Sequence, residues 1–275
     1  APLYGNGRSE ENLGFALKEL GESPLVSTKV RLDPGRLTDI SGEIRHSFEQ
    51  SLQRLGRDRV DFLFLHNPVD DPEKGDSITL DHVLGENGVA DAFKALRMEK
   101  RVSHVGFTAI GATASLHSIV NSRMFDIMQV YYNILNPSAG IEVPAGFDAQ
   151  NYENLIGVAA EQGVGVIAIR VLAAGMLAGK HPESSWATLS AGSDAASDQR
   201  RISELKKRFG LTSDKQLYSL ALRFVLTHEN VDCFPIGFST PEHIDQAIQA
   251  LETGPLGPEE YSNLLEIYTG PPFSR

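Results

Sequence analysis

A short apolar run, Phe62 to Leu65, constrains the fold more than any other stretch of the chain. It lies within VDFLFLHNP, residues 60–68, and is too short for an ordinary helix. A run like this is typical of a strand buried on both faces, as in a parallel sheet covered by helices. His66 follows directly, at the kind of strand end that carries chemistry in α/β barrels. Taken alone, His66 can equally be a hydrogen-bonded structural histidine.

Strand and helix patterns alternate along the whole chain, with no shift in composition that would mark a domain boundary. This alternation is typical of parallel βα units. Six strands leave two architectures open, an incomplete barrel and an open doubly wound sheet. No Gly-x-Gly-x-x-Gly follows a strand, which weakens the dinucleotide-binding version of the open sheet. The predicted strands are residues 24–30, 60–66, 102–108, 125–132, 164–172 and 231–236.

The composition restricts the classes of partner. The net charge is −11 in 275 residues, and an acidic chain without a basic stripe argues against nucleic acid and anionic membranes. Cys233 is the single cysteine, so no internal disulfide is available and a reducing cytoplasm is expected. No apolar run approaches the roughly 18 residues of a membrane helix. The histidines show no metal-ligand spacing, so no metal site is predicted.

Three polar residues are predicted within or just beyond the ends of successive β-units: Tyr4, Lys29 and His66. Adjacent parallel strands lie about 4.8 Å apart, so these side chains can meet. A phenol is too weak an acid at neutral pH, and a nearby ammonium favours its ionised form. Such a tyrosine can exchange a proton with a carbonyl oxygen, and a histidine can orient that oxygen. The set suits carbonyl/alcohol redox chemistry with a hydride-carrying cofactor.

At these residues the sequence resembles the aldo-keto reductases, over essentially its whole length. The resemblance is carried by APLYGNGRSEENLG, LVSTKV, SLQRLGRDRVDFLFLHNP, RVSHVGFT, MQVYYNIL and IGFSTPEHI. It implies a (β/α)8 TIM barrel, NADP(H) or NAD(H), and a small carbonyl or sugar substrate. It also implies Tyr4 as the acid/base, Lys29 as the residue that tunes it, and His66 as the residue that orients the substrate. The opening stretch looks most like the branch that oxidises aldoses or reduces simple aldehydes.

The resemblance also implies missing parts. An aspartate that pairs with Lys29 would precede Ala1, and so would the first one or two strands. Residues 1–275 are therefore expected to form a single barrel domain that is incomplete at its N-terminus. An open sheet edge invites aggregation, which favours a truncated record of a longer chain.

Two strand ends match the family's nicotinamide contacts. Thr108 corresponds to a residue near the nicotinamide amide, with Ala109 in place of the usual asparagine. Gln129 matches the glutamine that binds the same amide. The alternative for Gln129 is a polar strand residue that faces a helix.

After the strand at 164–172, the resemblance implies contacts to the rest of the nucleotide. Ile169 stands where an aromatic usually stacks on nicotinamide, and Arg170 follows it. Leu172 and Gly175 match the loop that approaches the pyrophosphate, where glycine allows close backbone approach. Trp186, in the long loop beyond, either lines the substrate pocket or covers the barrel.

The last predicted contact lies in GFSTPEHIDQAI, residues 237–248, with Gly237, Ser239 and His243 near the nucleotide. Ser239 and Thr240 are predicted to cap a helix that begins near Pro241, and a helix N-terminus attracts phosphate. NADP-preferring members usually carry Arg or Lys here. A histidine is only a pH-dependent cation, so weak discrimination between the two nucleotides, or an NAD preference, is expected.

Two functions follow. The first is a cytoplasmic NAD(P)-dependent oxidoreductase that interconverts an aldehyde, ketone or aldose with its alcohol. The alternative is a regulatory or interaction subunit that binds the nucleotide but turns over little. The oligomeric state stays open.

Overall fold

The structure is a computed structural model that describes residues 1–180 and 194–273. Its strands form one sheet in the order β1-β2-β3-β4-β5, in which β1 and β3 both pair with β2 in parallel. The described strands do not close an eight-stranded barrel. They are β1 (Ser27–Val30), β2 (Val60–Leu65), β3 (Val102–Ala109), β4 (Ile127–Tyr131) and β5 (Gly165–Ile169).

Contacts divide the chain into two compact units. Unit 1 comprises residues 1–129 and 161–165, and unit 2 comprises residues 130–160 and 166–275. The single-domain organisation expected from the sequence stays a prediction.

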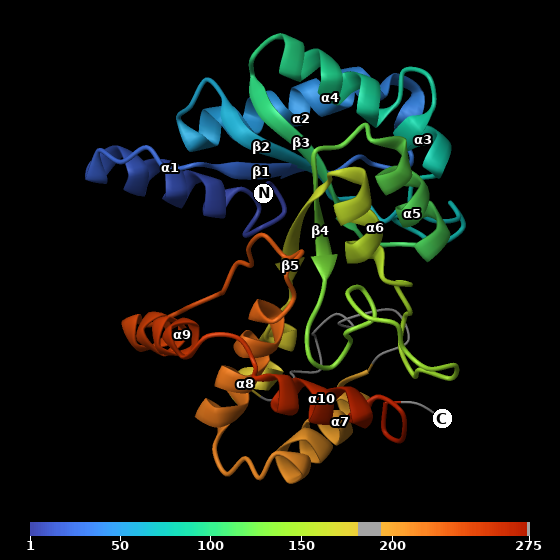
Figure 1. The fold of residues 1–275 in the computed structure, drawn as a ribbon. Helices are drawn as coiled ribbons and strands as arrows, with labels where there is room; N and C mark the ends of the chain where they lie inside the picture. The colour runs from blue at the N-terminus through green and yellow to red at the C-terminus, as the bar shows by residue number, and fades with distance from the viewer. Residues whose placement is uncertain (181–193, 274–275) are drawn as a thin grey trace. The chain divides into compact units, whose positions relative to one another are not determined.

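Unit 1 places helices against the first three strands, with α2 on β1 and α4 on β3 (Figure 1). α2 shows why: Ile44, Phe48 and Leu52 recur at helical spacing, and all three are buried. The helix starts at the cap Asp39, whose side chain accepts from the Gly42 N–H. The helices of unit 1 are α1 (Arg8–Leu20), α2 (Ile40–Leu55), α3 (Leu80–Leu84), α4 (Val89–Met98) and α5 (Thr113–Ser122), with a 3₁₀ turn at Leu37–Asp39.

Unit 2 is mainly helical, and its core includes the fully buried rings of Tyr132, Phe224, Tyr268 and Phe273. α6 (Leu155–Gln162) runs from unit 2 into unit 1. The other helices are the 3₁₀ segment η2 (Ala173–Ala178), α7 (Ala195–Arg208), α8 (Asp214–Leu226), α9 (Pro241–Thr253) and α10 (Pro258–Ile267). No helix in residues 1–180 and 194–273 is long and apolar enough to cross a membrane.

One predicted strand is wrong. Residues 231–236 form no strand, and Cys233 makes only an isolated parallel bridge to Ile167. The backbone of this segment pairs with β5 at Val166 and Ala168. Pro235 has no N–H to donate, so the pairing cannot continue beyond it as a ladder.

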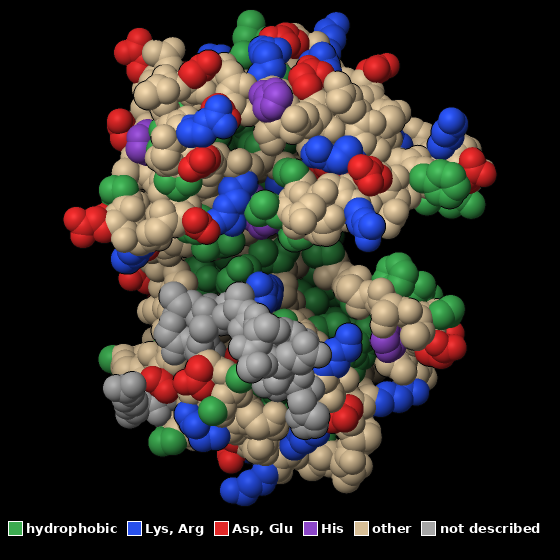
Figure 2. Space-filling model, turned by 180° about the vertical axis from the view of Figure 1, so that it is seen from behind, with side chains coloured by type: hydrophobic (Ala, Val, Ile, Leu, Met, Phe, Trp, Pro, Cys, Tyr) green, Lys and Arg blue, Asp and Glu red, His purple; other side chains and the backbone are tan. Residues whose placement is uncertain are grey.

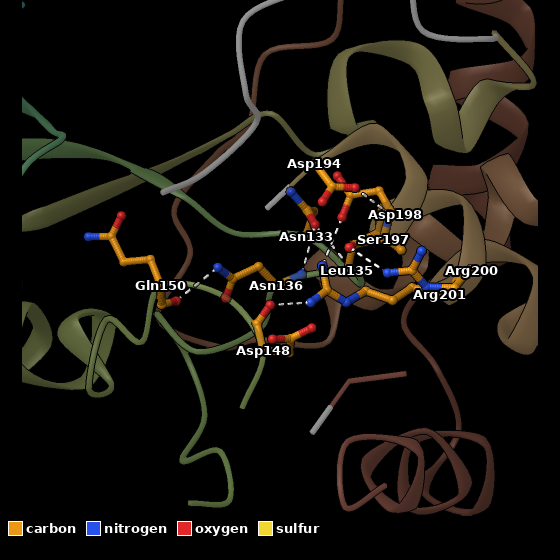
Figure 3. A network of polar contacts seen from close by, with 10 residues as sticks. All are labelled: Asn133, Leu135, Asn136, Asp148, Gln150, Asp194, Ser197, Asp198, Arg200 and Arg201. Atoms are coloured by element: carbon orange, nitrogen blue, oxygen red, sulfur yellow. Dashed lines mark hydrogen bonds and ion pairs between the residues drawn. The ribbon is translucent and has the colours of Figure 1, made fainter. Parts of the chain in front are cut away.

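A polar network in unit 2 connects the turn after β4 with α7 (Figure 3). Its centre is Arg201, whose side chain is fully buried. The guanidinium donates to the Asp198 carboxylate at 2.9 Å and to the backbone carbonyl of Asp148. It also lies 5.8 Å from the ring centroid of Phe273. The network therefore holds α7, the 133–152 segment and the C-terminal tail together.

On the face shown in Figure 2, acidic and basic side chains are interspersed. Mixed charge of this kind is typical of a solvated protein surface.

Candidate active site

Tyr4, Lys29 and His66 lie together in unit 1. Lys29 Nζ is 5.9 Å from the centroid of the Tyr4 ring, and the His66 and Tyr4 rings are 6.0 Å apart, edge to face. The strands produce this convergence, since Lys29 on β1 pairs in register with Phe64 on β2, and the His66 N–H donates to the Val30 carbonyl at 2.8 Å. Two neighbouring strand ends thus face the turn that carries Tyr4.

Lys29 is strongly perturbed by its surroundings. Its side chain is largely withdrawn from water, and burial lowers the pKa of its ammonium to about 8. Nζ donates to Oε1 of Gln129 at 2.6 Å. Gln129 is therefore a buried partner of Lys29, and the alternative of a polar residue facing a helix does not describe it. An amide leaves the ammonium charge uncompensated, so the site keeps a net positive charge when Lys29 is protonated.

His66 is neutral over the physiological pH range. Burial, together with the positive charges of Lys29 and Arg31, lowers its pKa to about 4. Its Nδ1 atom is buried and has no hydrogen-bond partner among the described residues. A structural histidine would normally have its buried nitrogens satisfied. The geometry therefore favours a histidine available to a ligand.

Asn67, next to His66, has a different role. It is fully buried, accepts from the Leu32 N–H and donates to the Leu32 carbonyl, both at 2.8 Å. These two hydrogen bonds fix the segment after β1 against the end of β2, and so they stabilise the backbone next to His66.

A cluster that the sequence did not reveal holds the turn of Tyr4 in place. The carboxylate of Glu10, at the start of α1, accepts from the Thr28 hydroxyl on β1 and from Arg54 Nε on α2 at 2.7 Å. Burial alone would raise the pKa of Glu10, but these hydrogen bonds outweigh it and the pKa lies below its ordinary value. Residues 10, 28 and 54 are too far apart in sequence for any spacing argument to join them.

Thr108, near the end of β3, is buried, and its hydroxyl oxygen has no partner among the described residues. An orphaned buried hydroxyl calls for an explanation, and a ligand group is one. Unit 1 therefore has two buried polar atoms, the Thr108 hydroxyl oxygen and Nδ1 of His66, that are able to bind a polar group.

The remaining predicted contacts lie in unit 2. Arg170 follows β5 with φ 57°, and its guanidinium carbon lies 5.5 Å from the Tyr131 ring centroid. The Leu172 carbonyl accepts from the Gly175 N–H at 2.8 Å. Gly175 has φ 97°, a conformation that favours glycine. These residues form one tight loop directly after β5, which ends at Ile169 and not at Leu172 as the sequence predicted.

The 237–243 segment is mostly exposed, including Gly237 and Ser239. α9 begins at Pro241 as predicted, but the capping prediction is wrong. Thr240 is the N-cap residue and makes no side-chain cap hydrogen bond. The Ser239 N–H donates instead to Nδ1 of His243 at 3.3 Å. The His243 ring thus accepts from the Ser239 backbone, while the His243 N–H donates to the Thr240 carbonyl at 3.2 Å.

Trp186 lies outside the described residues. Within residues 1–180 and 194–273, no group of three or more His, Cys, Asp or Glu side chains is placed to hold a metal ion.

Comparison with solved structures confirms the predicted α/β fold class. Aldo-keto reductase AKR11C1 from Bacillus halodurans, in its holo form, aligns with a TM-score of 0.71 at 23% identity, over 97% of this chain and 80% of that one. An aldo/keto reductase from Klebsiella pneumoniae, solved in complex with NADP and acetate, aligns with a TM-score of 0.64 at 21% identity. That alignment covers all of this chain and 80% of the other.

Sequence comparison gives the family. L-galactose dehydrogenase from Arabidopsis thaliana is 27% identical over 259 residues, which cover 91% of this chain and 72% of that protein. D-threo-aldose 1-dehydrogenase from Pseudomonas sp is 31% identical over 212 residues, 66% of this chain and 57% of that protein. The sequence model of the Aldo/keto reductase family matches residues 1–269. The chain therefore belongs to the aldo/keto reductase family of oxidoreductases.

Proposed function

We propose that this protein interconverts an aldehyde, ketone or aldose with the corresponding alcohol, using NADP(H) or NAD(H), with Tyr4 as the acid/base. The observation that carries the proposal is the convergence of a phenol, a buried ammonium and a neutral imidazole at one place in unit 1. A small carbonyl compound is the substrate class that such a set can bind and protonate.

The residues present fit a nicotinamide nucleotide. In unit 1, Thr108 offers a buried hydroxyl without a partner, and Gln129 offers an amide whose oxygen already accepts from Lys29. Both would contact the nicotinamide amide. Unit 2, considered by itself, has a loop that suits phosphate groups, because Arg170 supplies a cation and the left-handed Gly175 allows close backbone approach beside Leu172. When bound, the nucleotide supplies or accepts the hydride.

The chain's own residues handle the proton and the oxygen. The Tyr4 hydroxyl would give its proton to the carbonyl oxygen during reduction and take it back during oxidation. The ammonium of Lys29, desolvated and close to the Tyr4 ring, would stabilise the phenolate left behind. His66, neutral at physiological pH, would donate its ring N–H to the same oxygen and orient the carbonyl.

The substrate is proposed to be a sugar. Two relatives are named L-galactose dehydrogenase and D-threo-aldose 1-dehydrogenase, which supports an aldose as the substrate. A cytoplasmic location and the absence of a nucleic-acid partner are proposals as well, drawn from the acidic composition and the single cysteine.

For the nucleotide, we propose an NAD preference or weak discrimination. Neither Phe238 nor His243 provides a permanent cation beside the start of α9, where a 2′-phosphate would need one. The test is the ratio of kcat/KM for NADP and NAD with one aldose. A ratio above about 100 in favour of NADP, equal to roughly 2.7 kcal/mol, would refute this preference.

The test of the catalytic proposal is turnover at 340 nm with an aldose and aldehyde panel. Tyr4→Phe should lower kcat by at least about 10²-fold, since it removes the acid/base. Tyr218→Phe is the matched control, because the Tyr218 hydroxyl has no partner among the described residues. Nucleotide binding without turnover in the unmodified protein would instead support the alternative function, a regulatory subunit. That alternative is favoured by Ile169, which stands where an aromatic residue would stack on the nicotinamide.

A further inference from the structure

A buried asparagine joins the turn after β4 to the loop after β5. Asn133 Oδ1 accepts from the backbone N–H groups of Leu135 and Asn136, at 2.9 and 3.0 Å. Its Nδ2 donates to the carbonyl of Arg170 at 3.0 Å. Figure 3 shows Asn133 at this turn, directed toward the backbone that it holds. One amide therefore fixes its own turn and, through a second bond, the first residue of the neighbouring loop.

The loop that Asn133 holds has an unusual backbone. Arg170, Ala173 and Ala174 have φ values of 57°, 46° and 55°, and Gly175 follows with 97°. Residues with a Cβ atom rarely adopt these angles, so surrounding contacts must maintain them. The Arg170 carbonyl is the anchor of the loop, because it accepts from the Ala173 N–H at 2.8 Å as well as from Asn133.

The geometry points to Asn133 as a positioning residue for the nucleotide. Its amide holds the Arg170 carbonyl and thereby maintains the backbone of the strained loop that is assigned to the phosphates. Turns that combine right- and left-handed residues make concavities that bind anions. Strain that is held in place by a buried bond is typical of a preorganised ligand site. This inference rests on the proposed function, since it assigns the loop to nucleotide phosphates.

Asn136 provides a closely matched comparison within the same turn. It is as buried as Asn133, and its Nδ2 also donates to a backbone carbonyl at 3.0 Å, but that carbonyl belongs to Gln150. Its Oδ1 accepts from Ser138. The two asparagines therefore have the same chemistry and burial and differ in which segment they hold.

The experiment is a fluorescence titration of the purified full chain with NADPH and with NADH. Asn133→Asp keeps the acceptor for Leu135 and Asn136 but cannot donate to Arg170. It should raise Kd for the preferred nucleotide by about five- to tenfold, the effect of one lost hydrogen bond, and kcat at saturation should stay within about twofold. Asn136→Asp should leave Kd unchanged. Thermal melts of both variants establish that they are folded.

Asn133→Ser and Asn136→Ser form a second pair, for use if the buried carboxylate prevents folding. A hydroxyl can accept from the turn's N–H groups but is too short to reach the Arg170 carbonyl. Equal Kd values for the Asn133 and Asn136 variants would overturn the positioning role alone, because the unmodified protein would still bind nucleotide. Absence of binding by the unmodified protein would overturn the proposed function and this inference together.

Discussion

Arg201 offers the sharpest test of the packing in unit 2. Its side chain and that of Asp198 are exposed by only 1% and 3%, so neither charge can be hydrated where it stands. Arg201→Met keeps most of the apolar stem and removes the guanidinium. The Asp198 carboxylate then stays buried without its ion-pair partner, and the carbonyl of Asp148 loses a donor.

The expected loss of stability in Arg201→Met follows from the buried Asp198 carboxylate that remains. Removing one partner of a buried ion pair costs about 3–5 kcal/mol. At roughly 3 °C per kcal/mol for a unit of this size, the melting temperature should fall by about 10 °C. Arg200→Met is the matched control, since Arg200 is the exposed neighbour on the same helix and donates to the Ser197 hydroxyl at 2.7 Å. Its free energy of unfolding should change by about 0.5 kcal/mol or less.

Urea unfolding followed by circular dichroism at 222 nm measures both variants. A third variant, Arg201→Met with Asp198→Asn, also removes the buried carboxylate charge and should recover at least half of the lost free energy. Equal stabilities for Arg201→Met and Arg200→Met would refute the reasoning, and so would a double variant less stable than Arg201→Met.

Three further predictions concern the site and the sheet. Lys29 carries its charge below a pKa of about 8, so kcat should fall as the pH rises through 8. Lys29→Arg should move this fall in kcat to higher pH, because a guanidinium stays charged. A pH–rate profile in which the fall does not move contradicts this. Gly106→Ala should destabilise the chain by about 1–3 kcal/mol in urea melts, because a Cβ there would lie 2.4 Å from the Ile127 carbonyl oxygen. The control Gly270→Ala, which has open space around it, should leave the stability nearly unchanged. His243→Arg should raise kcat/KM for NADP relative to NAD by about tenfold through a permanent cation, and an unchanged ratio would place the 2′-position elsewhere.

The sequence predicted the parts of the site that depend on strand order. Parallel strands place their carboxyl ends along one edge, so residues just after or within those ends, Lys29 and His66, had to come close. The same strand-end argument predicted that Tyr4 meets them, although Tyr4 lies in a turn before α1 and follows no strand among the described residues. These positions follow from local patterns of burial and from the order of βα units.

What the sequence could not predict are pairings between distant residues. Gln129 bonds Lys29 across 100 residues, and the Glu10 cluster joins α1, β1 and α2. Such contacts depend on the direction of each side chain, and the hydrophobic periodicity of the sequence does not predict that direction. The strand wrongly predicted at 231–236 has a local cause. The β-branched and aromatic residues there suggested a strand, but Pro235 limited the pairing to a single bridge.

The neighbours His66 and Asn67 illustrate how one strand end serves two purposes. The side-chain oxygen and nitrogen of Asn67 both bond the backbone of Leu32. A substitution of Asn67 would therefore shift the His66 imidazole, although Asn67 itself contacts no reactant. Directed-evolution libraries that seek new substrates should therefore leave Asn67 fixed and vary the exposed positions around Tyr4. A substitution of Asn67 that improved activity on a new substrate would also make the His66 imidazole less rigidly positioned. Selectivity between sugars would then fall before the catalytic rate does.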